Sequence, residues 1–183
     1  MVGWALDSMN SGLISGTLPL IIRDLGLSPE VAGRVLSAWL AGMLVGGFTM
    51  GFLSDKLGRK AVIMLTLALM GAFSYLSSLA AGWLDLTVLR FLAGLGASGY
   101  MVVASTLLSE YSPTGVRGGM VAVLESSWAL GWLLSLVLAR VIAPYMGWRP
   151  VMQASAATLF YIPLLALLLP ESARFLAAKG RLD

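Results

Sequence analysis

Two acidic residues lie inside long apolar stretches of the sequence. Asp7 interrupts residues 2–22, and Glu125 interrupts residues 118–139. A charge at the centre of a bilayer costs at least ~2.5 kcal/mol on insertion scales, and ionisable residues there usually mark substrate, ion or proton pathways. The chain has no His and no Cys, so it lacks the commonest metal ligand and any thiol. We therefore expect no metal site and no cofactor, and any proton must be carried by a carboxylate.

Helical spacing places polar and aromatic side chains beside these acids. Asp7 shares a helix face with Asn10, and Glu125 shares one with Trp128 and Trp132, an arrangement that suits a small planar solute. A packing or interfacial role for the two tryptophans is the alternative. The candidate substrate or proton residues are Asp7, Asn10, Arg90, Tyr100, Glu125, Trp128 and Trp132.

The depth of these residues follows from the rise of ~1.5 Å per helical residue. Glu125 and Tyr100 would lie ~12 and ~15 Å from the inner surface, where they could line one cavity with Asp7. Arg90 would lie only ~8 Å below the outer surface. This difference in depth argues against a direct ion pair between Asp7 and Arg90.

The elements that position these residues are membrane helices. The sequence is 58% apolar and 11% charged, with a mean hydropathy of +0.89, whereas soluble domains are ~45–50% apolar and ~25% charged. About 20 apolar residues cross a bilayer. Six stretches have this length: 2–22, 35–54, 61–84, 91–109, 118–139 and 150–170. They predict an all-α, multi-pass membrane protein in which residues 1–183 form a single six-helix domain.

The basic residues predict the orientation of this domain. Lys and Arg are more frequent in loops on the cytoplasmic side of a membrane. One side of the predicted domain has seven (Lys56, Arg59, Lys60, Arg117, Arg174, Lys179 and Arg181), and the other has five (Arg23, Arg34, Arg90, Arg140 and Arg149). Both termini are therefore expected in the cytoplasm, with the chain in the cytoplasmic (plasma) membrane. The net charge of +3 is scattered, so no nucleic-acid partner is expected.

A weak internal repeat divides the chain. A shift of 89 residues places the loop 55–60 on residues 144–149, so that Gly58 falls on Gly147. Three spans separate these points, which therefore lie on opposite sides of the membrane. We expect an inverted three-plus-three repeat with units of about 1–84 and 85–183. This architecture favours a transporter over a structural bundle.

One loop carries a specific motif. Residues 51–60 read GFLSDKLGRK, which resembles the G-x-x-x-D-x-x-G-R-[KR] signature between helices 2 and 3 of the major facilitator superfamily. Residues 90–96 (RFLAGLG) resemble its helix-4 motif, and residues 170–176 (PESARFL) resemble the segment after helix 6 in sugar porters and organic-acid carriers. Residues 7–15, 109–113 and 124–132 are similar to the nicotinate-type metabolite:proton symporter branch.

The resemblance implies that this chain is the N-terminal half of a twelve-helix carrier. Its partners would be the lipid bilayer, a small solute, protons as an open alternative, and a second six-helix half, either a C-terminal half or a second copy of this chain. The loop would form a conformational latch of Gly51, Asp55, Gly58, Arg59 and Lys60. Inner-surface ion pairs would join Glu110 with Arg117 and Glu171 with Arg174.

Physical chemistry gives the latch residues individual roles. Neither Gly51 nor Gly58 is expected to accept a Cβ easily, because one permits close helix approach and the other a tight turn. Asp55 is placed where a carboxylate can cap the N-terminus of an adjacent helix. The alternative is a basic loop that serves topology alone, which we prefer for Lys60.

Two positions depart from the pattern of the resembled branch. Asn10 stands where proton-coupled members commonly have Asp, and Tyr100 stands where the nicotinate-like members usually have Glu. We expect a secondary transporter of an organic or aromatic acid that works by alternating access. The alternatives are a facilitative sugar-type carrier and a non-transporting membrane module. An enzyme is not expected.

Overall fold

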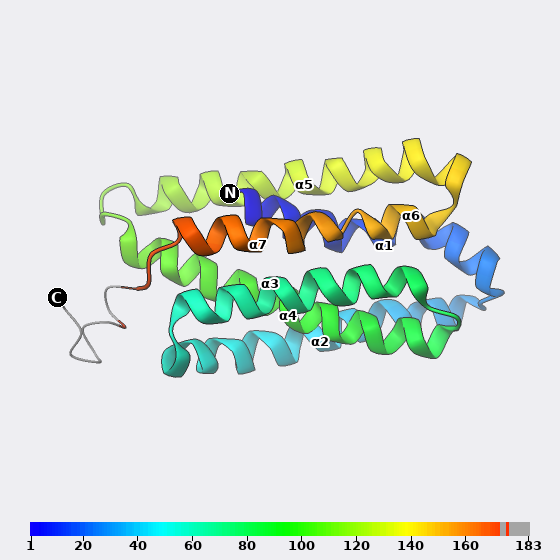
Figure 1. The fold of residues 1–183 in the computed structure, drawn as a ribbon, viewed down its shortest axis with the longest axis horizontal. Coiled ribbons are helices and arrows are strands. Elements are labelled where there is room, and N and C mark those ends of the chain that lie inside the picture. The colour runs from blue at the N-terminus through cyan, green and yellow to red at the C-terminus, as the bar shows by residue number, and fades with distance from the viewer. Residues whose placement is uncertain (173–174, 176–183) are drawn as a thin grey trace.

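The computed structural model describes residues 1–172 and 175, and their secondary structure is helical throughout. The helices run side by side along the long axis of the molecule (Figure 1). In chain order they are α1 (Val2–Leu25), α2 (Pro29–Leu57), α3 (Arg59–Leu76), η1 (Ser77–Leu79), α4 (Trp83–Tyr111), α5 (Arg117–Met146), α6 (Trp148–Gln153) and α7 (Ala156–Leu168). Because η1 extends α3, and α6 leads into α7, the predicted six-helix architecture is confirmed.

Five of the six predicted spans are both long enough and apolar enough to cross a membrane. They are Pro29–Leu57, Arg59–Leu79, Trp83–Tyr111, Arg117–Met146 and Trp148–Leu168. The remaining one, α1, has 24 residues, which span ~36 Å, but it is more polar. Its polar side chains include Asp7, Ser8, Asn10 and Thr17, all of them fully buried. The neighbouring helices, rather than lipid, therefore surround the polar part of α1.

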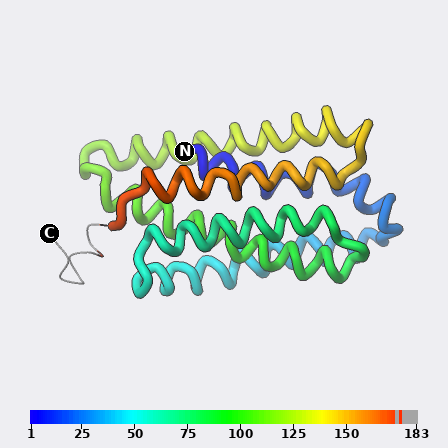
Figure 2. The backbone as a smooth tube through the Cα atoms, in the orientation of Figure 1, coloured from blue at the N-terminus to red at the C-terminus, as the bar shows by residue number. Residues whose placement is uncertain are grey.

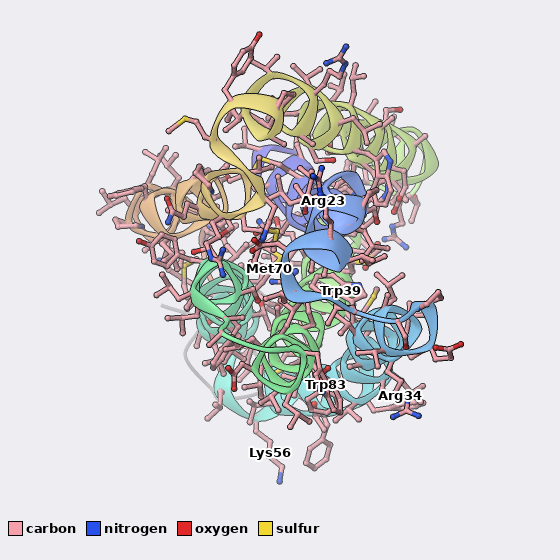
Figure 3. All side chains as sticks on the ribbon, turned by 90° about the vertical axis from the view of Figure 1, so that its right-hand side faces the viewer. Arg23, Arg34, Trp39, Lys56, Met70 and Trp83 are labelled. Carbon is pink, nitrogen blue, oxygen red and sulfur yellow. The ribbon has the colours of Figure 1, made fainter. Side chains whose placement is uncertain are left out.

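Glycines allow two pairs of helices to pack with their backbones in contact. In the α2–α4 pair, a Cβ on Gly42 would lie 2.0 Å from the carbonyl oxygen of Phe91. In the α1–α5 pair, a Cβ on Gly131 would lie 1.9 Å from the carbonyl oxygen of Ala5. The end-on view places α5 and α1 on one side of the bundle and α4 and α2 on the other (Figure 3). These two pairs form the two sides of the bundle.

The predicted repeat has a structural counterpart in two turns. Gly58 (φ +100°) separates α2 from α3, and Gly147 (φ +80°) separates α5 from α6. Each glycine ends one long helix and immediately precedes the next, in a conformation that other residues rarely adopt. The two turns lie at opposite ends of the bundle (Figure 2). The glycines are 89 residues apart in the sequence, which supports the inverted arrangement.

Candidate functional site

The polar side of α1 faces the interior of the bundle. Asp7 is fully buried, and neither of its carboxylate oxygens has a hydrogen-bond partner among the described residues. An ionised carboxylate without a partner is very costly in a low-dielectric interior. Asp7 is therefore a candidate proton site that the bundle encloses completely in this conformation.

Asn10 contacts α7 rather than an open cavity. Its Nδ2 donates to the carbonyl oxygen of Leu6 at 2.7 Å and to Oγ1 of Thr158 at 2.8 Å. Its Oδ1 is buried and has no hydrogen-bond partner among the residues that the structure describes. Asn10 therefore ties α1 to α7. Thr158 could not be identified from the sequence as a partner of Asn10, because 148 residues separate the two.

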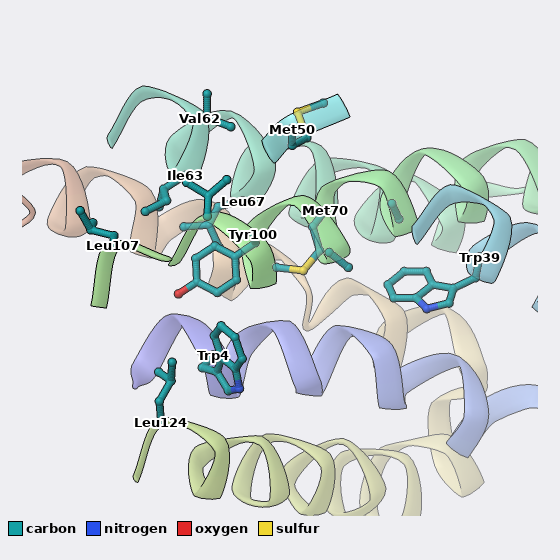
Figure 4. Close-up of a cluster of buried hydrophobic side chains, with 13 residues drawn as sticks. Trp4, Trp39, Met50, Val62, Ile63, Leu67, Met70, Tyr100, Leu107 and Leu124 are labelled. Carbon is teal, nitrogen blue, oxygen red and sulfur yellow. The ribbon is translucent and has the colours of Figure 1, made fainter. Parts of the chain in front are cut away.

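Tyr100 packs against α1 in a cluster of buried hydrophobic side chains that also contains Trp4. Its ring lies 6.0 Å from that of Trp4 between centroids, and Figure 4 shows the two rings facing each other from α4 and α1. A cavity of about 270 Å³ begins here and is lined by Tyr100, Tyr111, Tyr161 and mainly apolar side chains. The structure thus places Tyr100 against the α1 segment that carries Trp4 and Gly3, with Tyr161 as an additional neighbour.

Arg90 belongs to a separate part of the bundle. Its guanidinium is fully buried, donates to Oγ of Ser77 at 2.9 and 3.1 Å, and lies 5.4 Å from the Trp39 ring. Its Nη1 has no partner among the described residues. No ion pair joins Arg90 to Asp7 within the described part of the chain, as their expected depths indicated. The interior therefore has an acidic region and a basic region.

The predicted residues of α5 lie on the surface of this domain. Glu125 is exposed, Trp128 is half-buried and Trp132 is 36% exposed. The expectation that Glu125 is buried is therefore wrong for this chain, because α5 packs on α1 through a narrow stripe of other residues. Trp132 nevertheless borders α1, since its ring lies 3.5 Å from a Cβ built on Gly12. Glu125 and the two tryptophans thus belong to an accessible face rather than to the Asp7 interior.

The latch is a network centred on Arg59. Arg59 Nη1 donates to Oγ of Ser54 at 2.7 Å and to Oδ1 of Asp55 at 2.5 Å, and its Nη2 lies 3.5 Å from Oε1 of Glu110. Glu110 also accepts from Ser172. The predicted Glu110–Arg117 pair is not formed, because Glu110 faces α3 and Arg117 donates to the Ser112 carbonyl.

Glu171 takes the capping role that was expected for Asp55. Its Oε1 accepts from the backbone N–H of Lys60 at 3.1 Å and from that of Ser172 at 2.9 Å. Asp55 instead pairs with Arg59, and 65% of its side chain is exposed. The proposed partner of Glu171, Arg174, lies outside the described residues. The start of α3 is therefore tied to the segment that follows α7.

Gly51 and Gly58 differ in their tolerance of a side chain. A Cβ on Gly51 would meet only Val102, at 3.5 Å, so the expectation of a close approach there is wrong. A Cβ on Gly58 would lie 2.5 Å from Oε2 of Glu171, in a positive-φ turn. We expect Gly58→Ala to destabilise the chain by ~1–2 kcal/mol, and Gly51→Ala to have little effect. Thermal unfolding of both variants in detergent checks this difference, and equal unfolding midpoints would contradict it.

Comparison with known proteins gives consistent matches along the chain. The model of the Major Facilitator Superfamily matches residues 1–181. The niacin transporter NiaP of Acinetobacter baylyi is 33% identical over 182 residues, which are 100% of this chain and 42% of that protein. A gallate transporter of Pseudomonas putida is 35% identical over 174 residues, covering 94% of this chain and 39% of that protein.

Solved structures share the same fold. The inward-open xylose transporter XylE from E. coli has a TM-score of 0.85 at 20% identity, covering 98% of this chain and 48% of that structure. At this identity the likeness concerns the fold alone. The chain spans less than half the length of each of these relatives. The two curated relatives are named as transporters, in agreement with the expectation that the chain is not an enzyme.

Proposed function

Because this chain belongs to the major facilitator superfamily, we propose that it is the N-terminal half of a secondary carrier for a small organic acid. The buried, unpaired carboxyl of Asp7 is the observation that carries the proposal. A structural helix has no reason to enclose such a group, whereas a carrier can use it to bind and release a proton. A non-transporting membrane module is therefore less well supported.

The solute is proposed to be a monocarboxylic aromatic acid. Two similar proteins are named for niacin and gallate, both of which join a planar ring to a carboxyl group. The accessible face offers Trp128 and Trp132, of which Trp132 borders α1 at Gly12, and aromatic side chains with a few polar groups suit such a ring. Arg90 supplies a buried cation for which no carboxylate partner is found within 4 Å in the described part of the chain.

The complete carrier is proposed to consist of this chain and a second six-helix half, from the same polypeptide or from a second copy. Glu125 and the latch carboxylate Asp55 are exposed in this domain, so both are accessible to another half. Alternating access would move the two halves about a midplane site. We place the latch and both termini in the cytoplasm and the carrier in the plasma membrane, as the basic residues indicate.

Selectivity tests this proposal. Vesicles containing the complete carrier are expected to take up radiolabelled nicotinate, and excess benzoate is expected to compete with it. Glucose should not compete, because it offers neither a carboxylate nor a planar ring. Protein-free vesicles provide the control for passive entry of the acid. Competition by glucose with none by benzoate would instead identify a sugar-type carrier, and absence of any carrier-dependent uptake would favour a non-transporting module.

A further inference from the structure

Two cavities meet between α1 and α5 at the end of the bundle opposite the latch, here called the distal end. One, of about 520 Å³, is lined in part by Arg23, Asp24 and Arg149. The other, of about 430 Å³, is lined in part by Leu136 and Arg140. Leu20 lines both. The two cavities are therefore neighbours on either side of Leu20, and we call them together the distal groove.

The single carboxylate among the lining residues of this groove is already engaged. Oδ2 of Asp24 accepts from Nε1 of Trp148 at 2.9 Å and from Nη1 of Arg149 at 2.8 Å. Arg149 also lies 4.6 Å from the Trp148 ring and donates to the carbonyl oxygen of Ala80. Asp24 and Arg149 therefore compensate each other's charge.

Two arginines of the groove remain uncompensated. Arg23 and Arg140 are exposed, and neither lies within 4.0 Å of a carboxylate in the described part of the chain. Figure 3 looks onto the distal end and shows Arg23 near its centre, whereas Arg34 of α2 lies at the rim. Exposed positive charges at the mouth of a groove attract anions and raise their local concentration.

On α5 the lining of the groove extends from Arg140 to Leu136, which lies one helical turn from the accessible Trp132. Arg140, Leu136 and Trp132 follow one stripe of α5 at a spacing of four residues. Arg140 therefore lies ~12 Å along the helix from Trp132. On the α1 side, Gly16 lines the groove, and Ser15 beside it is exposed. Cations at the mouth and an aromatic ring below it match a solute with a carboxylate and a planar ring.

We propose that Arg140, together with Arg23, forms an entry site that first binds the carboxylate of the transported organic acid. This inference rests on the proposed function and adds residues that select for anions before the central site is reached. If the distal end faces outward, its arginines oppose the general bias of Lys and Arg toward the cytoplasm. A role in solute recruitment accounts for their presence there.

The test compares Arg140→Gln with two control variants. Arg140→Lys keeps the charge, and Arg34→Gln removes a charge at the rim, away from the groove. In vesicles containing the complete carrier, Arg140→Gln is expected to raise the KM for nicotinate about fivefold at low salt, as for the loss of one exposed ion pair, with kcat unchanged. High salt should raise the wild-type KM and remove most of this difference. Arg140→Lys should retain most of the wild-type affinity, and Arg34→Gln should behave as wild type.

A neutral solute and a binding measurement complete the design. Competition by nicotinamide, which lacks the carboxylate, should be unchanged by Arg140→Gln. Equilibrium binding of radiolabelled nicotinate to the reconstituted protein separates the two proposals. If wild type binds nicotinate in an Arg140-dependent way without transporting it, the proposed function fails and the entry site stands. The entry site is refuted if Arg140→Gln changes neither the binding of nicotinate nor its KM. It is also refuted if the substitution weakens the interaction with nicotinamide as much as that with nicotinate.

Discussion

Replacing Asp7 with Asn is expected to abolish proton-driven accumulation of the organic acid while leaving solute exchange intact. Asn resembles a permanently protonated carboxyl, so the carrier can still change its access state but cannot release a proton. With one proton carried per carboxylate, an inward gradient of one pH unit supplies ~1.4 kcal/mol, which sustains about tenfold accumulation. In Asp7→Asn the ratio of internal to external nicotinate should fall to about one.

Two further variants make this result specific to Asp7. Asp85→Asn makes the same chemical change at an exposed residue in the first turn of α4, and it should keep the tenfold accumulation. Glu125→Gln tests the other candidate proton site, which the structure places on the accessible surface rather than in the interior. Collapse of accumulation in Glu125→Gln with normal accumulation in Asp7→Asn would transfer the proton role to α5.

A second large effect is expected from adding a single methyl group to Gly131. Its Cβ would lie 1.9 Å from the carbonyl oxygen and 2.8 Å from the Cα of Ala5. Because these are backbone atoms, α5 must move away from α1. We expect Gly131→Ala to destabilise the chain by ~3 kcal/mol, at the upper end for overpacked cores, and to lower its thermal unfolding midpoint in detergent.

The matched control lies on the same helix. Gly118→Ala places a Cβ that meets no atom within 4 Å in the described part of the chain, apart from its chain neighbours and the backbone of its own helix. Its unfolding midpoint should therefore equal or exceed that of wild type, since Ala favours helix. An equal loss in both variants would show that helix propensity, rather than the α1–α5 contact, determines the result. Because the same contact positions Trp132 beside Gly12, Gly131→Ala should also weaken nicotinate binding.

The fold was predictable because it depends on properties that a sequence displays directly. Apolar length indicated the spans, and Gly58 with its neighbours indicated the turn between α2 and α3. The polar part of α1 was predicted as a span despite Asp7, and the structure explains why it can be one: its polar side chains face other helices. The 89-residue repeat was weak in sequence, yet its two glycines adopt similar positive-φ turns.

The site was less predictable because helical spacing shows which residues share a face but not what that face contacts. Asp7 and Asn10 face the interior, whereas Glu125 does not. Glu110 pairs with Arg59 instead of Arg117 because α3 packs beside α4. Glu171 caps α3 from 111 residues away. Such contacts depend on how helices rotate and assemble, which local sequence patterns do not encode.

We propose that the Asp7 carboxyl enclosed within this half couples transport of an organic acid to that of a proton. The most direct measurement is nicotinate uptake by vesicles that contain the complete carrier, with an imposed inward gradient of one pH unit and protein-free vesicles as the reference. We predict that the carrier accumulates nicotinate about tenfold inside the vesicles. An uncoupler should remove this accumulation, and Asp7→Asn should abolish it. Carrier-dependent uptake that only equilibrates nicotinate across the membrane, and is identical in wild type and Asp7→Asn, would contradict it.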